Sequence, residues 1–389
     1  MKYLLISLLF VSLSHSQNIN LSTGSIKESD YYQEVPFEIV LGKIIIPVTI
    51  NTKSYHFILD TGAPNLISNK ILKEINSTPI SKIAVKDGNN TQDSLEIINV
   101  AAIQLGNITF ENQTALVSDI ENHPFLKCYP IDGFIGSNLF RNSILKISLK
   151  DKKIIITDKI KSLKPTEKPT EMQVIGSQGK PCIWIEYQNT NHKKAREQAL
   201  IDTGMDGFYD LSNRSYAVLK KEGIYEILAK SLGYGNISLF GTGIQNEQEQ
   251  LNIPYFKINQ SVFKNVSTNT HEEHTSGIGL DFFNYGDGIL DFIHHKFYFE
   301  NAISEQLMNA PEKYSATYIN NKYIIDFVWD LDLKSKIKPG NEVLRIDQFN
   351  IKEMSPCELL TVKPYLKNHK NYEMEVKLED NSVIQLRIE

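Results

Sequence analysis

Short apolar runs separated by polar turn residues follow one another along most of this chain, and this pattern predicts strands. In the first half, Lys43–Ile50 and Tyr55–Leu59 flank the turn residues Asn51–Ser54, which predicts a hairpin. In the second half, Cys182–Tyr187 and Glu197–Ile201 predict another hairpin of the same kind. We therefore expect an all-β fold.

Helices are expected at two similar places along the chain. Ser68 can cap a short helix at Asn69–Ile75. Ser212 precedes a longer stretch, for which we expect a helix from residue 213 to about residue 232.

The two halves repeat each other. Three pairs of equivalent residues are separated by 142 to 144 positions: Asp60 and Asp202, Ser68 and Ser212, and Gly136 and Gly279. A repeat of this length indicates a duplicated lobe and not a solenoid unit. We expect one lobe at residues 35–158 and a second at residues 172–300, joined by a linker near residues 161–168. A separate β-rich domain is expected at residues 313–389.

Each half also carries an apolar strand that runs into an Asp-Thr-Gly turn, at Asp60-Thr61-Gly62 and at Asp202-Thr203-Gly204. A buried carboxylate is costly unless it is paired. Two carboxyl groups a few ångströms apart cannot both ionise easily, so they share one proton. One of them can then act as a base on water while the other donates a proton to a carbonyl oxygen.

The other residues of the two turns suit a close approach. Gly62 and Gly204 allow each backbone turn to come near its twin, and the hydroxyls of Thr61 and Thr203 can hydrogen-bond across the junction. One Asp-Thr-Gly alone is also typical of a solvated corner between a strand and a turn. Two copies behind equivalent apolar strands favour a shared site.

With these motifs, the region from about residue 37 to residue 300 resembles a single-chain, two-lobed aspartic peptidase with short, retropepsin-like lobes. The resemblance also rests on Phe134-Ile135-Gly136 and Gly277-Ile278-Gly279, which in that superfamily pack behind the catalytic turns. It implies an acid-protease-like fold in which Asp60 and Asp202 form the catalytic pair. It further implies an endopeptidase that acts on polypeptide substrates through an activated water, without a metal or an organic cofactor.

The resemblance gives a role to two hairpins. Ile83–Val85 and Leu95–Val100 flank a turn at Asp87 and Gly88, which predicts a hairpin placed as a flap over the site. Gly241–Gly243 marks an equivalent turn in the second half. An extended substrate would add strand-like hydrogen bonds beneath the first hairpin.

One residue departs from the pattern of that superfamily, which prefers Ser, Thr or Ala after the Gly. Ala63 fits, whereas Met205 does not. A bulky thioether at this position is expected to distort the second turn. It motivates the alternative function, a peptide-binding protein of the same fold with weak turnover or none.

Residues 313–389 resemble a PDZ-like module, a tail that exported bacterial peptidases of this type often carry. Tyr323–Val328 is the predicted groove strand, and Ile337–Asp347 contains a Pro-Gly turn leading into another strand. Asn341 replaces the usual Asp, and Gln348 stands where Gly is common. We expect this tail either to recruit substrates through an extended chain terminus or to pack on the second lobe.

Charge and the first residues suggest where the protein acts. A net charge of −5 and a pI near 6.0 argue against a nucleic-acid partner. A basic start and the apolar run Tyr3–Leu13 predict a signal peptide at residues 1–16, followed by a loose polar segment to about residue 34. We expect an exported protein, periplasmic or secreted, without stable membrane insertion; an uncleaved anchor helix is the alternative. The oligomeric state stays open.

The remaining candidate residues are expected to be structural. The cysteines, Cys128, Cys182 and Cys357, are too few and too widely spaced for a disulfide framework and are expected to be small buried residues. Residues 271–274 (His-Glu-Glu-His) lack the His-Glu-x-x-His pattern and are expected to form a solvated loop.

Two further groups are expected to bind no metal. His294 and His295 lie in a predicted hairpin without a carboxylate partner nearby in the sequence. Asp287 lies between two glycines and is expected to be a turn residue, because no acidic ladder of the calcium-loop type follows it.

Overall fold

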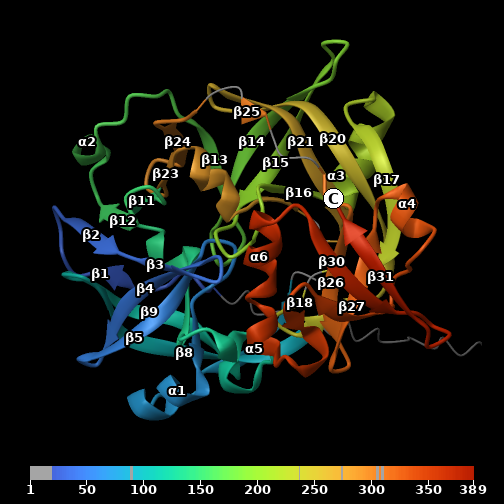
Figure 1. The fold of residues 1–389 in the computed structure, drawn as a ribbon. Helices are drawn as coiled ribbons and strands as arrows, with labels where there is room; N and C mark the ends of the chain where they lie inside the picture. The colour runs from blue at the N-terminus through green and yellow to red at the C-terminus, as the bar shows by residue number, and fades with distance from the viewer. Residues whose placement is uncertain (1–19, 88–90, 236, 273–274, 304–305, 308–310) are drawn as a thin grey trace, which may run out of the picture.

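The computed structural model describes residues 20–87, 91–235, 237–272, 275–303, 306–307 and 311–389. Two strand-rich lobes lie side by side, and a smaller C-terminal unit, residues 311–389, lies against both of them (Figure 1). The predicted all-β class is confirmed, because strands dominate and the helices between them are short. The predicted signal peptide at residues 1–16 lies outside the described residues. Within them, no helix is long and apolar enough to cross a membrane.

The N-terminal lobe is built on one folded sheet with the order β1-β9-β6-β10-β5-β4-β8-β7, and β3 pairs with β4. Within it, β10 runs parallel to β5 and antiparallel to β6, which places Gly136 beside Asp60. Alternate residues of β4, such as Ile44 and Ile46, point into the apolar core. The strands are β1 (Ser25–Ile26), β3 (Glu38–Val40), β4 (Lys43–Ile50), β5 (Lys53–Asp60), β6 (Leu66–Ser68), β7 (Ser81–Lys86), β8 (Gln92–Leu105), β9 (Ile108–Ser118) and β10 (Gly133–Gly136).

The C-terminal lobe repeats this arrangement. Here β22 runs parallel to β15 and antiparallel to β16, so that Gly277 pairs with Leu200 as Phe134 pairs with Ile58 in the first lobe. The strands are β14 (Lys180–Gln188), β15 (Lys194–Ile201), β16 (Tyr209–Ser212), β17 (Glu226–Gly233), β18 (Ile237–Ser238), β19 (Gly241–Thr242), β20 (Asn246–Ile258), β21 (Ser261–His271), β22 (Ser276–Ile278) and β25 (Gln306–Leu307).

A shared sheet joins the two lobes in the order β13-β24-β23-β11-β12-β2, and the pairing of β11 with β23 links the halves. The hairpins β11–β12 and β23–β24 therefore meet in one layer. These strands are β2 (Tyr32–Pro36), β11 (Ile144–Ser148), β12 (Lys153–Thr157), β13 (Thr170–Ile175), β23 (Asp287–Asp291) and β24 (Lys296–Glu300).

The C-terminal unit has its own small sheet and its own apolar core. The predicted strand at 323–328 is confirmed as part of β27, which pairs with β26 and β28. The PDZ-like character of the unit stays a prediction. Its elements are β26 (Tyr314–Ile319), β27 (Lys322–Val328), α4 (Leu331–Lys334), β28 (Glu342–Ile346), β29 (Phe349–Asn350), α5 (Pro356–Leu359), α6 (Val362–Asn368), β30 (Tyr372–Lys377) and β31 (Val383–Ile388).

The short helices of the lobes begin as expected. The predicted helix at 69–75 is α1 (Asn69–Ile75), and the Ser68 hydroxyl accepts a hydrogen bond from the Ile71 N–H at 3.3 Å. A helical turn, α2 (Ile160–Leu163), lies at the start of the predicted linker. The lobes also contain α3 (Asn213–Leu219) and short 3-10 turns, η1 (Ile120–Asn122), η2 (Leu126–Cys128), η3 (Ser137–Phe140), η4 (Lys220–Glu222) and η5 (Leu280–Tyr285).

Two predictions about elements were wrong. The helix expected over residues 213–232 ends at Leu219, and most of the remaining stretch forms β17, which pairs with β20. The segment before residue 34 is not loose, because β1 pairs with β9 and β2 pairs with β12. In both cases a partner strand distant in sequence satisfies the backbone hydrogen bonds.

The cysteine prediction was wrong for two of the three residues. Cys128, at the end of η2, and Cys357, in α5, form a disulfide although they are 229 positions apart. Spacing along the chain does not reveal such a pair, because tertiary packing brings it together. Cys182 is a free, buried cysteine, as expected.

The C-terminal unit also contacts both lobes away from the disulfide. The Val328 N–H donates to the Ser231 hydroxyl at 2.8 Å, and the Tyr234 N–H donates to Asp326 at 2.5 Å, which joins β27 to the C-terminal lobe near β17. On the other side, the Tyr318 ring lies edge-on to Phe125 of the N-terminal lobe, with ring centroids 5.6 Å apart. The unit therefore bridges the two lobes.

Candidate active site

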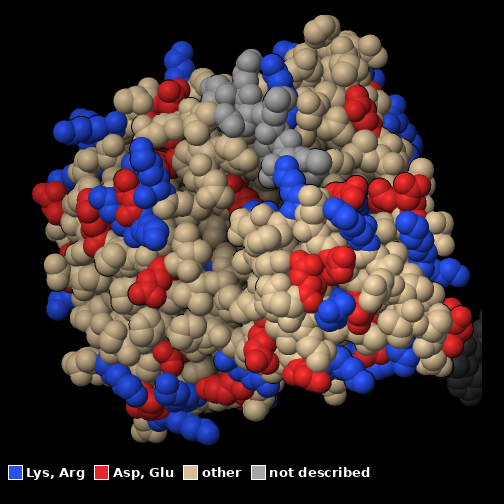
Figure 2. All heavy atoms as spheres, in the orientation of Figure 1, with Lys and Arg blue, Asp and Glu red and all other residues tan. Residues whose placement is uncertain are grey.

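The two Asp-Thr-Gly turns meet at the junction of the lobes. We call Asp60-Thr61-Gly62-Ala63 the first turn and Asp202-Thr203-Gly204-Met205 the second turn. Each begins where β5 or β15 ends beside its parallel neighbour, β10 or β22. Figure 2 shows a hollow in this face of the molecule, between the N-terminal lobe and the C-terminal unit. The structure thus brings together the two aspartates that the sequence repeat singled out.

The glycines of the two turns are required by the closeness of this approach. A Cβ atom on Gly62 would lie 2.3 Å from the Asp202 Oδ2 atom, and a Cβ atom on Gly204 would lie 2.3 Å from the Asp60 Oδ2 atom. Any side chain at either position would therefore displace the opposite carboxyl group.

The threonines interlock the two turns by reciprocal hydrogen bonds. The Thr61 hydroxyl donates to the Ile201 carbonyl at 2.7 Å, and the Thr203 hydroxyl donates to the Leu59 carbonyl at 2.8 Å. Each hydroxyl also accepts from the backbone N–H of the opposite threonine at 3.1 Å. Both threonines are fully buried, so these bonds fix the separation and orientation of the turns.

The second turn is not distorted by Met205, contrary to expectation. Asp202 Oδ1 accepts from the Gly204 and Met205 N–H groups at 2.9 and 3.2 Å, as Asp60 Oδ1 accepts from the Gly62 and Ala63 N–H groups at 3.0 Å each. The thioether lies over Gly277, whose Cβ position would be 2.7 Å from its sulfur. The first lobe has Phe134 at the position of Gly277.

The electrostatics of the site favour one proton on the carboxyl pair. Burial, and then the negative charge of Asp202, raise the pKa of Asp60 from 3.8 to about 8, whereas the Lys43 ammonium partly opposes this rise. A hydrogen bond to the Asp202 carboxyl group adds a smaller contribution to the rise in the pKa of Asp60. Because the folded state binds this proton more tightly than the unfolded chain does, Asp60 makes folding less favourable as the pH rises from about 4 towards 8.

Two residues that the sequence analysis missed hold the carbonyl groups of the turns across the junction. Lys43 Nζ lies 2.5 Å from the Gly204 carbonyl oxygen, and Gln178 Nε2 donates to the Gly62 carbonyl at 2.8 Å. Strand register could have pointed to Lys43, because the β4–β5 pairing, extended by two residues beyond Ile45 and Ile58, places Lys43 level with Asp60. No sequence motif marks Gln178.

The predicted flap is a hairpin of β7 and β8, and its turn residue Gly88 lies outside the described residues. Asp87 caps this hairpin, because its Oδ1 atom accepts from the Thr91 N–H at 3.0 Å. Its Oδ2 atom accepts from the Phe240 N–H at 2.8 Å, so the hairpin meets one from the other lobe.

This second hairpin extends from β17 and β20 and ends in the small β18–β19 pair, near the predicted flap-like turn at 241–243. Leu239 and Phe240 pack against apolar residues of the N-terminal lobe, among them Leu95 and Ile97. His123 Nδ1 accepts from the Leu126 N–H at 2.9 Å, so the other ring nitrogen, Nε2, donates to the Ser238 carbonyl at 3.2 Å.

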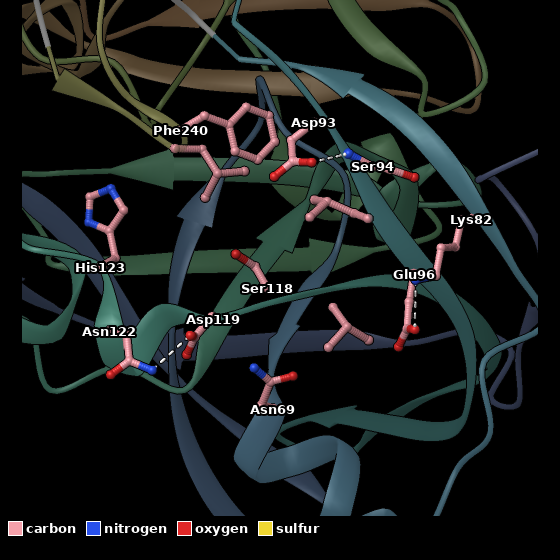
Figure 3. Close-up of a pocket in the computed structure, with 13 residues that line it drawn as sticks. Asn69, Lys82, Asp93, Ser94, Glu96, Ser118, Asp119, Asn122, His123 and Phe240 are labelled. Atoms are coloured by element: carbon pink, nitrogen blue, oxygen red, sulfur yellow. Dashed lines mark hydrogen bonds and ion pairs between the residues drawn. The ribbon is translucent and has the colours of Figure 1, made fainter.

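A pocket of about 450 Å³ lies where the hairpins meet the N-terminal lobe. Figure 3 shows the Phe240 ring beside Asp93 at one end of it, and His123 on the neighbouring element. The lining combines apolar residues with polar groups from α1, β8 and the end of β9. The protein's own second hairpin thus forms one wall of the pocket, through Leu239 and Phe240.

Several expectations about the other candidate residues need correction. His294 Nδ1 lies 2.8 Å from Asp291 Oδ2, so the expectation of no nearby carboxylate was wrong. His271 ends β21, and burial lowers its pKa to about 4, so it is not part of a solvated loop. Asp287 begins β23 and pairs with Lys146 at 3.0 Å. Glu273 and His274 lie outside the described residues.

Among the residues that the structure describes, no cluster of three or more His, Cys, Asp or Glu side chains is arranged to hold a metal ion.

Comparisons with known proteins agree with this architecture in its first lobe. Residues 46–139 match the family model described as aspartyl protease, which covers the first turn and β10 but not the second turn. No curated protein matches the chain. One similar solved structure is the aspartic proteinase from Irpex lacteus, at 14% identity and a TM-score of 0.42, covering 69% of this chain and 96% of that one. The family-model match and the strand topology together show an aspartic-peptidase-like fold.

Proposed function

We propose that this protein is an exported aspartic endopeptidase that uses the Asp60–Asp202 pair to hydrolyse peptide bonds. The observation that carries the proposal is the interlocked pair of turns, in which each glycine lies against the opposite carboxyl group. The raised pKa of Asp60 supports it, because it leaves one carboxyl group protonated at neutral pH.

In the first step of the proposed reaction, the carboxylate of Asp202 takes a proton from a water molecule as the water oxygen attacks the peptide carbonyl carbon. Asp60 gives its proton to the carbonyl oxygen, which yields a neutral tetrahedral diol. In the second step, Asp202 gives its proton to the amide nitrogen, a hydroxyl group of the diol returns its proton to the Asp60 carboxylate, and the C–N bond breaks. The products are a carboxylic acid and an amine, and the pair again holds one proton.

We propose that the substrate binds as an extended chain between the turns and the two hairpins. Main-chain hydrogen bonds to a hairpin strand would hold it without regard to sequence. Because the hairpins contact each other through Asp87 and Phe240, they must separate for such a chain to enter. Polypeptides are therefore the proposed substrate class.

Export to an oxidising compartment is part of the proposal. The predicted signal peptide is one reason. The Cys128–Cys357 disulfide is another, because such bonds persist mainly in periplasmic and extracellular proteins. The alternative, a protein that only binds peptides, is less well supported. It rested on distortion of the second turn by Met205, and the second turn has the same hydrogen bonds as the first.

The test is cleavage of a mixed peptide library by the purified protein, with and without the transition-state inhibitor pepstatin. Asp60→Asn and Asp202→Asn should each lower kcat/KM by several orders of magnitude, because each removes half of the unit that shares the proton. Asp151→Asn, in an exposed turn, is the matched control and should cleave normally. Most of the activity surviving in either active-site variant would disprove the mechanism.

A further inference from the structure

Asp206, two residues after Gly204, is held between ammonium groups from two different parts of the chain. Its Oδ1 atom lies 2.6 Å from the Lys43 Nζ atom of the N-terminal lobe, and its Oδ2 atom lies 2.8 Å from the Lys363 Nζ atom of α6. Burial would raise the pKa of Asp206, but the two lysines lower it below its usual range. The carboxylate is therefore ionised and bound on both sides.

The position of α6 is fixed by contacts other than Lys363. Cys357, in the preceding helix, is covalently joined to Cys128 of the N-terminal lobe. One turn beyond Lys363, Lys367 Nζ lies 2.9 Å from Asp281 of the C-terminal lobe. The helix thus lies along the seam between the lobes, beside the hollow that leads to the turns (Figures 1 and 2).

A continuous set of short contacts connects α6 with the catalytic pair. Lys363 binds Asp206, Asp206 binds Lys43, and Lys43 donates to the Gly204 carbonyl oxygen. The Gly204 N–H in turn donates to Asp202 Oδ1 at 2.9 Å. Lys43 is also the cation that opposes the rise in the pKa of Asp60.

Exposure shows where each member of this set lies. The Lys43 side chain is 18% exposed, that of Asp206 is 42% exposed and that of Lys363 is 73% exposed. A single exposed ion pair contributes little to stability. Lys363 therefore matters through what it does to Asp206 and the more buried Lys43, and a methionine in its place should leave the fold intact.

We propose that Lys363 is a positioning residue of the active site, which makes the C-terminal unit part of the catalytic machinery. By binding one carboxylate oxygen of Asp206 it keeps this carboxylate from fully neutralising Lys43, and it helps to fix the second turn. This inference rests on the proposed peptidase function. It predicts that the unit is needed to cleave short peptides, and not only to recruit long proteins.

The test compares Lys363→Met with Lys367→Met, a matched variant that removes an ion pair one helical turn away. On a short peptide, Lys363→Met should lower kcat about tenfold with little change in KM, whereas Lys367→Met should stay near the wild-type rate. Lys363→Arg should recover most of the rate, because it restores the charge. A short peptide and a long protein should be affected equally.

The pH profile is a second readout, which a purely structural role would not change. Without Lys363, Asp206 pairs with Lys43 alone, and the electrostatic effect of Lys43 on Asp60 weakens. The pKa of Asp60 then rises, so the alkaline limb of the pH–rate profile moves to higher pH. The charged and titratable groups that interact with Lys43 are Asp60, Asp206, Tyr129 and Lys363; those that interact with Lys363 are Lys43, Tyr129, Asp206, Asp210, Glu312 and Tyr323. All of them are unchanged in Lys367→Met, which should keep the wild-type limb.

Equal kcat values and equal alkaline limbs in Lys363→Met and Lys367→Met would overturn the inference. If the wild-type protein cleaves nothing, the proposed function fails instead. The inference is then tested by measuring the free energy of unfolding as a function of pH. The values of the Asp60→Asn derivative of each protein are subtracted, so that the difference reports the titration of Asp60. The pH at which Asp60 releases its proton should rise in Lys363→Met only, and an unchanged pH would refute the positioning role.

Discussion

At the residue scale, the two turns reach the same geometry with different side chains. The second has the large Met205 over Gly277, whereas the first has the small Ala63 and the large Phe134 at the equivalent positions. Each lobe thus has one large and one small residue at these two positions, so that the large thioether has space in the second lobe. The preference of the superfamily for a small residue after the glycine therefore has to be considered together with the size of the residue at the position of Phe134 or Gly277.

Ala63 offers a direct test of how the turn sets the acidity of the pair. Its backbone N–H already donates to Asp60, but its side chain has no donor. In Ala63→Ser, a hydroxyl that donates to the ionised carboxylate should lower the pKa of Asp60 below its present value of about 8. The alkaline limb of the kcat/KM profile should move to lower pH, and Ala63→Val, with no donor, should not shift it downwards. A limb that moves up in Ala63→Ser would contradict this account.

The aspartates, threonines and glycines of the site were predictable from sequence, because two buried carboxylates at equivalent strand ends are costly unless they pair with each other. Lys43 was partly predictable from strand register. Asp206 and Lys363 were not, because their contact joins residues 157 positions apart through the docking of a separate unit. Long-range ion pairs leave no periodic signal in a single sequence.

At the element scale, the two hairpins are joined by a few contacts at their ends. Asp87 of one hairpin binds the Phe240 N–H of the other, and His123 of the N-terminal lobe binds the Ser238 carbonyl. Leu239 and Phe240 add apolar packing to the same lobe.

Phe240→Ala should weaken the contacts that hold the second hairpin against the N-terminal lobe, without unfolding the protein. The ring is only half-buried, so its loss should cost about 1–2 kcal/mol, less than for a fully buried phenylalanine. Amide hydrogen exchange near Ser238 should become roughly tenfold faster. Leu232→Ala, whose side chain is 47% exposed on β17, is the control and should leave this exchange unchanged. Equal exchange in Phe240→Ala and the wild type would show that the ring does not hold the hairpin.

The same hairpin shows why a helix was expected where a strand occurs. Ile227, Leu228 and Leu232 have a spacing that fits one face of a helix, but all three are largely exposed in β17. The spacing of these three residues therefore does not mark the buried face of a helix. Pairing with β20 decides the backbone conformation, and β20 lies beyond the hairpin tip.

At the scale of the whole molecule, the two lobes and the C-terminal unit are joined to one another at two places. The shared sheet joins the lobes at their base through β11 and β23, and the C-terminal unit joins them again beside the hollow. The unit has its own core, yet it binds Ser231 and Tyr234 in one lobe and Cys128 in the other. Independent motion of the lobes about the catalytic pair is thereby restricted.

The disulfide should be a major source of this restriction. A link between residues 229 positions apart removes much entropy from the unfolded chain, about 5 kcal/mol in the chain-entropy description. The paired variant Cys128→Ser/Cys357→Ser should therefore unfold at a lower denaturant concentration than the oxidised wild type. Reductant should lower the wild-type midpoint to that of the variant and leave the variant unchanged, since the free thiol of Cys182 is buried in both. A wild-type midpoint that is insensitive to reductant, with the bond shown to be broken, would mean that noncovalent contacts alone hold the C-terminal unit in place.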